Sequence, residues 1–558
     1  MDVRDSIRQA LCSALEKAGV SVAPQDIPLE HPADLAHGDY ASGVALSQSK
    51  AAGMNPRALA EKLLAGLGEI SGVSKIEIAG PGFINFHLSS QTLGESVKKA
   101  VETDMWGANS DLAGKKIMVE YTDPNPFKEF HIGHLMSNAI GEAISRSLQF
   151  SGAEIFRANY EGDVGPHVAK AIWGYMHLEH VGHSSEVGKW SAAYVQGAKF
   201  YESDERIKIE IDTINKKVYE RSDEEVNRLY DIGRKTSLDH FEEIYQILGT
   251  KFNHYFFESE TAPLGVTLVK AHPEVFEESD GAIVYKGERD GLHTRVFITS
   301  KGLPTYEAKD LGLAELKTET WPFDISITVT AQEQADYFAV VLAAMRNVLP
   351  EIAPKMRHIS HGMMRLPTGK MSSRTGDVIT GESLLDELIE QAKVRSAESR
   401  ADDHEKLAQD VAVAAIKYQI LKQGSGKDII FDRDRALSLE GDSGPYLQYA
   451  HARAHAVVQK AKETGIEPSI DPNAPPNDLS RLLHRFPEIV ERTAILYEPH
   501  VLANYLIQVA SSFNSWYANE QILDGTPTAA HKVALTAAVA RTLKNGLWML
   551  GIPAPEKM

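Results

Sequence analysis

A strand–helix–strand pattern that begins at Lys115 constrains the fold of this chain more than any other feature of the sequence. The apolar segment KKIMVEYT predicts a strand that ends before Pro124. Apolar residues then recur at helical spacing, and EIFRANY after Ser151 predicts a second strand. The residues expected on one face of this helix are Met136, Ile140, Ile144 and Leu148. Strand, helix and strand within about 50 residues have the size of a βαβ unit, which predicts a parallel, doubly wound sheet.

The flanking regions have different patterns, so the 558 residues predict about three to four cores rather than one. Near the N-terminus, an amphipathic helix precedes VSKIEIAG and GFINFHLS, whose alternation across the turn at Gly80–Gly82 predicts a β-hairpin. From about Leu384 onward, nearly every segment has helical spacing. We therefore expect a multidomain α/β protein. Its predicted parts are an N-terminal α+β domain (1–110), a Rossmann-like parallel-sheet domain with an insertion at about 183–255 (111–385), and an all-α helical bundle (386–558).

The composition restricts the cellular compartment in which the chain can work and the kind of partner that it can bind. With Cys12 as the only cysteine, neither an intramolecular disulfide nor a cysteine-rich zinc site is possible, which favours a reducing, cytoplasmic location. The N-terminus carries Asp2 and Asp5 where an export signal would be basic, and no apolar stretch is long enough to cross a membrane. The net charge of −19 opposes a polyanionic partner overall. However, residues 401–558 carry 16 Lys and Arg against 19 Asp and Glu, so a local nucleic-acid surface remains open.

The segment NPFKEFHIGH places His131 and His134 one helical turn apart at the start of the predicted helix. Backbone N–H groups and the helix dipole favour phosphate there, and two imidazoles add donors that can follow charge on a phosphorus centre. Gly133 between them lets a flat base or a sugar approach the backbone. Two histidines on a helix are also common as partly buried packing residues, and a zinc site would need a third ligand, which is not evident.

A second motif, LPTGKMSSRTGDVIT, strengthens the phosphate interpretation of the first. It places Lys370 and Arg374 in a Gly/Ser/Thr-rich loop between a predicted strand and a helix that starts near Glu382. A single lysine in such a loop is usually a solvated surface residue. Together with a phosphate site at a helix terminus, however, the basic loop indicates a clamp on a triphosphate.

The two motifs together resemble the HIGH and KMSKS signatures of the class I aminoacyl-tRNA synthetases, with KMSSR as a variant of KMSKS. The surrounding residues are similar to the arginyl-tRNA synthetases in particular. The matching segments cover nearly the whole chain and are VEYTDPNPFKEFHIGHLMSNAIGEAISRSLQFSG, NYEGDVG, GLPTYEAKDLGLA, HGDYAS, GFINF, GPYLQYAHAR and LGIPAPEKM. The resemblance implies an arginine–tRNA ligase that uses ATP with Mg²⁺, arginine and arginine tRNA, and that acts as a monomer.

The resemblance also implies roles for the residues of the two motifs. In that family the HIGH histidines contact ATP phosphates and stabilise the five-coordinate transition state, which assigns this role to His131 and His134. Gly133 would face adenine. The first lysine of the loop matches Lys370, which would hold the leaving pyrophosphate. The loop residues expected beside it at ATP are Met371, Ser372 and Ser373.

One charge of the KMSKS pattern is missing, because its second lysine corresponds to Ser373 in this chain. Family members without that lysine commonly carry one just before the HIGH motif. Lys128 takes that place, so we expect it to compensate for the missing charge, with Arg374 as the alternative. Asp163 in YEGDVG is either a turn residue or a support beside the ribose.

Arginine as the substrate requires an acidic site, because the five donors of a guanidinium need planar carboxylate acceptors. By resemblance, Tyr306 and Asp310 would face the guanidinium, and Glu258 would add a second acidic contact. The α-amino and carboxylate end of the substrate would be held by Glu120, Asn125 and Gln334.

The tRNA would contact both outer domains. Phe83 and Asn85 resemble the face that the family turns to the D-loop, where an aromatic ring can stack on an unpaired base, although a strand phenylalanine is also a common core residue. The candidates in the C-terminal anticodon-binding region are Tyr446, Gln448, Tyr449 and Arg453. Two alternatives remain open. One is a nucleotidyltransferase of the same superfamily that acts on a small metabolite without tRNA, and the other is an inactive tRNA-binding protein.

Overall fold

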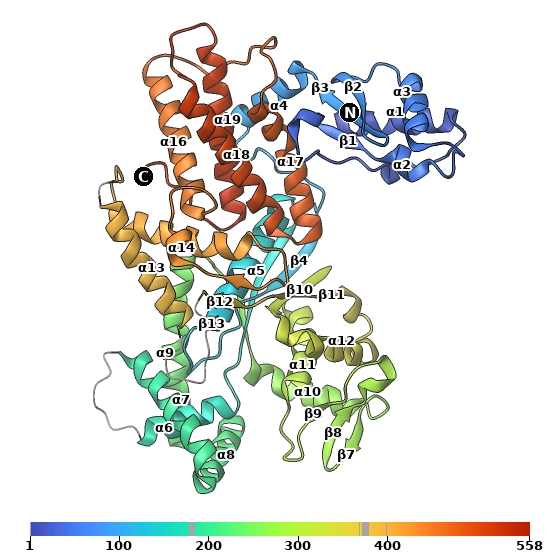
Figure 1. The fold of residues 1–558 in the computed structure, drawn as a ribbon. Coiled ribbons are helices and arrows are strands. Elements are labelled where there is room, and N and C mark those ends of the chain that lie inside the picture. Colours follow the sequence, from blue (N-terminus) through green and yellow to red (C-terminus); the bar gives the residue numbers. More distant parts are fainter. Residues whose placement is uncertain (1, 178–184, 368, 371–378, 398) are drawn as a thin grey trace. The chain divides into compact units, whose positions relative to one another are not determined.

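The computed structural model describes residues 2–177, 185–367, 369–370, 379–397 and 399–558 (Figure 1). The chain divides into two units. Unit 1 comprises Met1–Gly107, Ala450–Glu488 and Leu506–Asn545, and unit 2 comprises Ala108–Tyr449, Ile489–Tyr505 and Gly546–Met558. The division into the spans 1–110, 111–385 and 386–558 stays a prediction.

A five-stranded parallel sheet lies at the centre of unit 2, with its strands in the order β11-β10-β4-β5-β6. The strands are β4 (Lys116–Glu120), β5 (Glu154–Glu161), β6 (His254–Phe257), β10 (Ile325–Ala331) and β11 (Met356–His361). Strands β4 and β10 are buried over most of their length, as expected of strands that are covered on both faces. The sheet confirms the predicted doubly wound architecture, and the loops that leave its carboxyl edge are where such folds bind ligands.

Helix α5 (Ile132–Phe150) connects β4 to β5 and packs against the sheet (Figure 1). Its predicted apolar face is buried through Met136, Ile144 and Leu148. Gly141 permits close packing, since a Cβ there would lie 2.2 Å from Cγ of Tyr121, the residue that follows β4. The helix is therefore fixed tightly against the end of the central strand.

The described residues between β5 and β6 form a helical insertion of α6 (Pro166–His177), α7 (Glu186–Ser203), α8 (Glu205–Glu220) and α9 (Glu224–Leu248). Helices thus begin before the predicted insertion start at about 183. The later helices of unit 2 are α10 (Glu258–Ala271), α11 (Tyr306–Thr320), α12 (Ala335–Val348), α13 (Gly381–Ser396), α14 (His404–Leu421) and α15 (Arg433–Ala436). Two small sheets join them, one of β7 (Glu277–Ser279), β8 (Ala282–Tyr285) and β9 (Arg295–Ile298), the other of β12 (Met364–Leu366), β13 (Gly369–Lys370) and β14 (Ile429–Ile430).

Unit 1 contains a three-stranded antiparallel sheet in the order β1-β3-β2. Strands β2 (Val73–Ala79) and β3 (Phe83–Leu88) form the predicted hairpin, and β1 (Tyr40–Ser42) pairs with β3. Gly82 has a positive φ of 136° at the turn, where a Cβ would lie 2.9 Å from the carbonyl oxygen of Pro56. The helices that share a core with this sheet or follow it are α1 (Val3–Lys17), α2 (Val44–Gln48), α3 (Pro56–Gly66) and α4 (Ser90–Glu102).

The C-terminal region is helical, as predicted, apart from the two-residue strand β14, and its last four helices contribute residues to both units. They are α16 (Gly444–Glu463), α17 (Asp478–Leu496), α18 (Pro499–Asn519) and α19 (Ala529–Met549). Among the described residues, no helix combines the length and the apolar character that a membrane span needs.

Candidate active site

The loop that joins β4 to α5 is strained. Thr122, Asp123 and Phe127 all have positive φ angles, of 85°, 48° and 68°, which non-glycine residues rarely adopt. Strain of this kind persists where the surroundings hold it and is typical of ligand sites. Here the insertion holds it, because the N–H of Phe127 donates to Oγ of Ser237 at 2.9 Å and its ring packs edge-on against Trp190. The loop therefore fixes the direction in which the backbone enters His131.

The two histidines of the HIGH motif stand together at the N-terminal end of α5. His131 is the N-cap residue, and its ring stacks on that of His134 with the centroids 3.6 Å apart. Desolvation lowers the pKa of His131 to about 4, with Lys128 adding to the effect, and lowers the pKa of His134 well below its usual range. Both rings are therefore neutral at pH 7. Because Nδ1 of His134 accepts the N–H of His131 at 3.3 Å, its proton lies on Nε2, which can donate to a ligand.

Gly133, between the histidines, faces open space. A Cβ at this position would meet only Nδ1 of His131, at 3.8 Å, which is ordinary contact. The packing of the protein thus does not require a glycine in the first turn of α5, where alanine would favour the helix. A ligand that approaches the backbone closely would explain why glycine occupies this position, and the sequence predicts such a ligand.

Lys128 places a cation near this helix terminus. Its ammonium lies 5.1 Å from the ring centre of Tyr194 in the insertion. Desolvation and the nearby Lys170 lower its pKa. A partly desolvated cation without a carboxylate hydrogen-bonded to it within the described residues is well suited to an anionic ligand.

The structure describes part of the second motif. The backbone of Lys370 pairs with Arg365 in the small sheet β12–β13, while Met371, Ser372, Ser373 and Arg374 lie outside the described residues. Where the description resumes, the N–H of Gly381 donates to the carbonyl oxygen of Phe130 at 2.8 Å. A Cβ on Gly381 would lie 3.0 Å from the carbonyl oxygen of His131. The segment that follows KMSSR therefore contacts the start of the HIGH helix directly.

Three of the predicted arginine-binding residues, Asp310, Tyr306 and Glu258, lie on α10 and α11. Oδ2 of Asp310 accepts the hydroxyl of Tyr337 at 2.6 Å, and desolvation raises the pKa of Asp310 to about 7. The ring of Tyr306, at the first position of α11, is 53% exposed. Glu258 is already engaged, since Oε2 accepts the ammonium of Lys309 at 2.5 Å in a buried ion pair.

The other three predicted residues, Glu120, Asn125 and Gln334, follow or end strands of the sheet. Glu120 at the end of β4 is buried and ion-paired with Lys317 at 2.5 Å. Asn125 lies against the loop after β5, where a Cβ on Gly162 would be 2.4 Å from its Oδ1 and 3.4 Å from Oε1 of Glu258. Gln334 is exposed just after β10. All three lie at the carboxyl edge of the sheet, as the parallel topology requires.

Sequence reasoning missed the chain's own cations in this pocket. Lys309 and Lys317 are both buried on α11 and neutralise two of the predicted substrate carboxylates. The spacing of Lys317 from Asp310, at seven positions, was a usable signal, because residues seven apart share a helix face, whereas nothing in the sequence indicated the role of Lys309. Asp163 supports the surrounding structure rather than lining the pocket. It is buried and accepts hydrogen bonds from Tyr230, Arg234 and Ser259.

The predicted tRNA contacts divide into exposed and buried residues. Phe83 is 40% exposed on β3, whereas Asn85 is buried, and its contact with tRNA stays a prediction. Gln448 is fully buried, and its amide donates to the carbonyls of Asp410 and Pro553 at 3.0 and 2.9 Å, so its contact with tRNA also stays a prediction. Tyr446, Tyr449 and Arg453 keep partial exposure, and Arg453 contacts Asn514 and the ring of Tyr517.

Comparison with protein-family models covers most of the chain in three segments. Residues 96–433 match the catalytic domain of "tRNA synthetases class I (R)". Residues 447–558 match the "DALR anticodon binding domain", and residues 4–88 match the "Arginyl tRNA synthetase N terminal domain". The parallel sheet, the histidines at the start of α5 and the helical C-terminal region thus define a class I aminoacyl-tRNA synthetase.

Comparison with similar proteins identifies the family within this class. An arginine–tRNA ligase from Chromobacterium violaceum is 31% identical over 580 residues, with 100% of both chains covered, and one from Treponema pallidum is 29% identical over 592 residues with the same coverage. The solved arginyl-tRNA synthetase of Thermus thermophilus matches with a TM-score of 0.82 and 27% identity over 100% of both chains. The chain belongs to the arginyl-tRNA synthetase family. This confirms the fold class, the ligase class and the arginine–tRNA ligase function expected from the sequence.

Proposed function

We propose that this chain attaches arginine to arginine tRNA through the site built around His131, His134 and Asp310. In the first step a carboxylate oxygen of arginine attacks the α-phosphorus of ATP, the bond to the pyrophosphate oxygen breaks, and arginyl-adenylate forms. In the second step a hydroxyl of the terminal ribose attacks the carbonyl carbon, and AMP leaves. The observation that supports this most is the contact of Gly381, just after KMSSR, with the backbone of Phe130 and His131.

At the ATP end, the chain supplies donors rather than a nucleophile. The neutral rings of His131 and His134 donate to phosphate oxygens, and the open backbone at Gly133 receives the adenine. Lys128 and Lys370 hold the pyrophosphate as its charge builds. Mg²⁺ would arrive with ATP as part of the substrate and add charge neutralisation at the phosphates. The remaining members of the ATP site are Met371, Ser372, Ser373 and Arg374.

At the amino-acid end, Asp310 is the principal acceptor for the guanidinium. The carboxylates of Glu258 and Glu120 are each bound to a lysine of the chain, whereas Asp310 has a tyrosine hydroxyl as its partner within the described residues. The exposed ring of Tyr306 covers the guanidinium from the pocket rim. Asn125 and Gln334 bind the α-amino and carboxylate groups beside the ATP site.

The tRNA binds through the outer regions, with Phe83 at the D-loop and with Tyr446, Tyr449 and Arg453 in the anticodon region. We propose that adenylate formation requires bound tRNA. We further propose that the enzyme works as a monomer in the cytoplasm, a location that the single cysteine favours.

The decisive experiment is aminoacylation of total tRNA with each radiolabelled amino acid in turn, with ATP and magnesium. Charging with arginine alone is expected, and arginine-dependent pyrophosphate exchange should appear only when tRNA is present. His131→Ala should abolish both, whereas the matched control His272→Ala, at the C-cap of α10 with its ring bonded to the carbonyl of Leu268, should change neither. Charging with another amino acid would refute the pocket assignment. Full exchange without tRNA would refute the tRNA requirement.

A further inference from the structure

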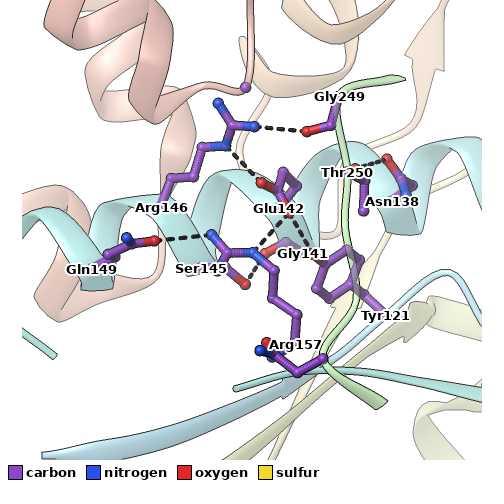
Figure 2. Close-up of polar contacts among 12 residues, drawn as sticks. Tyr121, Asn138, Gly141, Glu142, Ser145, Arg146, Gln149, Arg157, Gly249 and Thr250 are labelled. Carbon is purple, nitrogen blue, oxygen red and sulfur yellow. Dashed lines mark hydrogen bonds and ion pairs between the residues drawn. The ribbon is translucent and has the colours of Figure 1, made fainter. Parts of the chain in front are cut away.

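A buried carboxylate on α5, far from the histidines, organises a polar network. Glu142 is almost fully buried and binds three partners: the hydroxyl of Tyr121 at 2.5 Å, Nε of Arg146 at 2.6 Å and Nε of Arg157 at 3.1 Å (Figure 2). Burial raises the pKa of Glu142, but the two arginines and Lys417 outweigh this effect, so its pKa is lowered. The group is therefore an anion at neutral pH, and it fixes the two guanidinium groups in place.

Arg146 extends this network to two other parts of the chain. One terminal nitrogen donates to the carbonyl oxygen of Gly249, just after α9, at 2.8 Å (Figure 2). The other donates to the carbonyl oxygen of Trp548 near the C-terminus at 3.1 Å, and the guanidinium lies 5.4 Å from the ring centre of Trp548. A single side chain of α5 thus binds the end of the insertion and the C-terminal segment at once.

Lys417 on α14 binds the same two segments from another side. Its ammonium is fully buried and donates to the carbonyl oxygens of Leu248 at 2.7 Å and Gly551 at 2.8 Å. Desolvation lowers its pKa to about 7, with Arg146 adding to the effect and Glu142 opposing it. The chain keeps this cation although burial of an ammonium is costly. We call Arg146 and Lys417, with the four carbonyls that they bind, the α5 anchor.

The segments held by the α5 anchor also contact the site loop. Helix α9, which ends at Leu248, carries Ser237, whose hydroxyl accepts the N–H of Phe127 in the strained loop. Thr250 donates to Asn138 of α5 at 3.0 Å, and Asn138 in turn donates to Thr122 in that loop at 3.0 Å. Any shift of α9 against α5 would therefore displace the residues that lead into His131.

From these contacts we infer that Arg146 and Lys417 are positioning residues for adenylate formation, because they lock the C-terminal segment and the end of α9 onto α5 and so fix the HIGH histidines. Arg146 is twelve residues beyond His134, about 18 Å along the same helix, so it cannot contact ATP itself. A helix transmits rotation and translation over such a distance, and a displacement of about 1 Å at a reacting group can cost about 100-fold in rate. The inference rests on the proposed role of His131 and His134.

A matched pair of variants separates positioning from simple support of Glu142. Arg146→Lys keeps a cation beside Glu142 but loses the fork that reaches both carbonyls. Arg157→Lys perturbs the same carboxylate, but within the described residues the guanidinium of Arg157 otherwise bonds to Gln149 of α5, so the anchor stays intact (Figure 2). Lys417→Met, of similar length but uncharged, removes the second half of the anchor.

The measurement is arginine-dependent pyrophosphate exchange with tRNA present, expressed per active site titrated with a non-hydrolysable arginyl-adenylate analogue. Arg146→Lys and Lys417→Met should lower kcat about 10- to 100-fold, with KM for ATP and arginine within about twofold of wild type. The double variant should lose less than the product of the two single losses, because both cations hold the same segments. Arg157→Lys should stay within about threefold of wild type.

Equal losses in Arg146→Lys and Arg157→Lys, or losses that vanish per titrated site, would overturn the inference and leave the network a role in folding only. If Lys417→Met does not fold, deletion of residues 551–558 removes the carbonyl of Gly551 and tests the same contact. Failure of the wild type to charge tRNA with arginine would instead refute the proposed function, so the two failures are distinguishable.

Discussion

The backbone N–H of Gly381 donates to the carbonyl oxygen of Phe130 at 2.8 Å, which joins the end of the KMSSR segment to the start of the HIGH helix. The two motifs are about 240 residues apart in the chain, yet this bond brings the first residue of α13 to the residue before His131. Since both segments are proposed to hold the phosphates of ATP, their mutual position controls the catalytic geometry.

Gly381→Ala should therefore reduce activity without reducing stability. The added Cβ would lie 3.0 Å from the carbonyl oxygen of His131 and 3.1 Å from Cδ1 of Phe130, so α13 or the HIGH helix must shift. We expect kcat for pyrophosphate exchange to fall about tenfold, while the melting temperature stays the same or rises, because alanine favours a helix. Gly424→Ala is the control, since its Cβ would make only ordinary contacts of 3.7 Å or more. Equal activity of the two variants would contradict the expectation.

Gly133→Ala should separate ligand approach from protein packing. Because a Cβ at Gly133 would contact no protein atom closer than 3.8 Å, the free energy of unfolding should rise by about 0.4–1 kcal/mol. KM for ATP should rise at the same time, because the methyl group would meet the nucleotide. Thermal unfolding and ATP titration of the exchange rate measure the two effects. An unchanged KM for ATP would remove Gly133 from the ATP site.

Asp310→Ala should weaken arginine binding by about 2–5 kcal/mol, since it removes the partner of a buried cation. KM for arginine should rise accordingly, while KM for ATP changes little. Asp111→Ala, an exposed aspartate of unit 2, is the control and should change neither value. An unaltered KM for arginine in Asp310→Ala would exclude this carboxylate from the pocket.

Arginine binding should also release a proton in a pH-dependent way. Desolvation raises the pKa of Asp310 to about 7, so the empty site is largely protonated at pH 6 and largely ionised at pH 8. A guanidinium requires the ionised form of Asp310. About 0.9 proton per site should therefore be released on binding at pH 6, and about 0.1 proton at pH 8. Calorimetry in buffers of different ionisation enthalpy measures this number. Asp310→Asn should abolish the pH dependence, and a proton count independent of pH would contradict the assignment.

Unit 1 should lose stability in acid through Glu488 on α17. This carboxylate accepts the hydroxyl of Tyr40 and lies 3.3 Å from His31 of the N-terminal region, and these groups with Arg4 outweigh its desolvation and lower its pKa to about 2. Because the folded pKa lies below the unfolded value near 4.5, the stabilisation is full above pH 4.5 and is lost as the pH falls toward 2. Glu488→Gln should remove about 3 kcal/mol at pH 7. A parallel pH profile of unfolding in the variant and the wild type would argue against it.

Local patterns were enough to predict the parallel sheet, helix α5, the N-terminal hairpin and the helical C-terminal region. Each of these follows from the spacing of apolar residues within a short segment, as in the strand before Pro124 and the buried face with Met136 and Leu148. The two motifs also identified the family, because their residue types and order are specific.

The pairings across the site were not predictable in this way. Glu258 on α10 meets Lys309 of α11, and Glu120 on β4 meets Lys317 of the same helix α11, so their charges are balanced by residues that only the fold brings together. The burial of side chains such as Gln448 was equally unpredictable from the sequence. Gln448 has the chemistry of an RNA contact, but it packs inside because Asp410 and Pro553 approach it from distant segments.

The contact of Lys417 with Gly551 also constrains how the chain is completed during synthesis. The five strands of the central sheet have all left the ribosome once His361 has emerged, whereas Trp548 and Gly551 are made about 190 residues later. Until then Arg146 and Lys417 lack half of their carbonyl acceptors, and water must take the place of these carbonyls. Unit 2 can therefore form this contact only after residue 551 has been made, and a nascent chain arrested before Trp548 lacks both carbonyls.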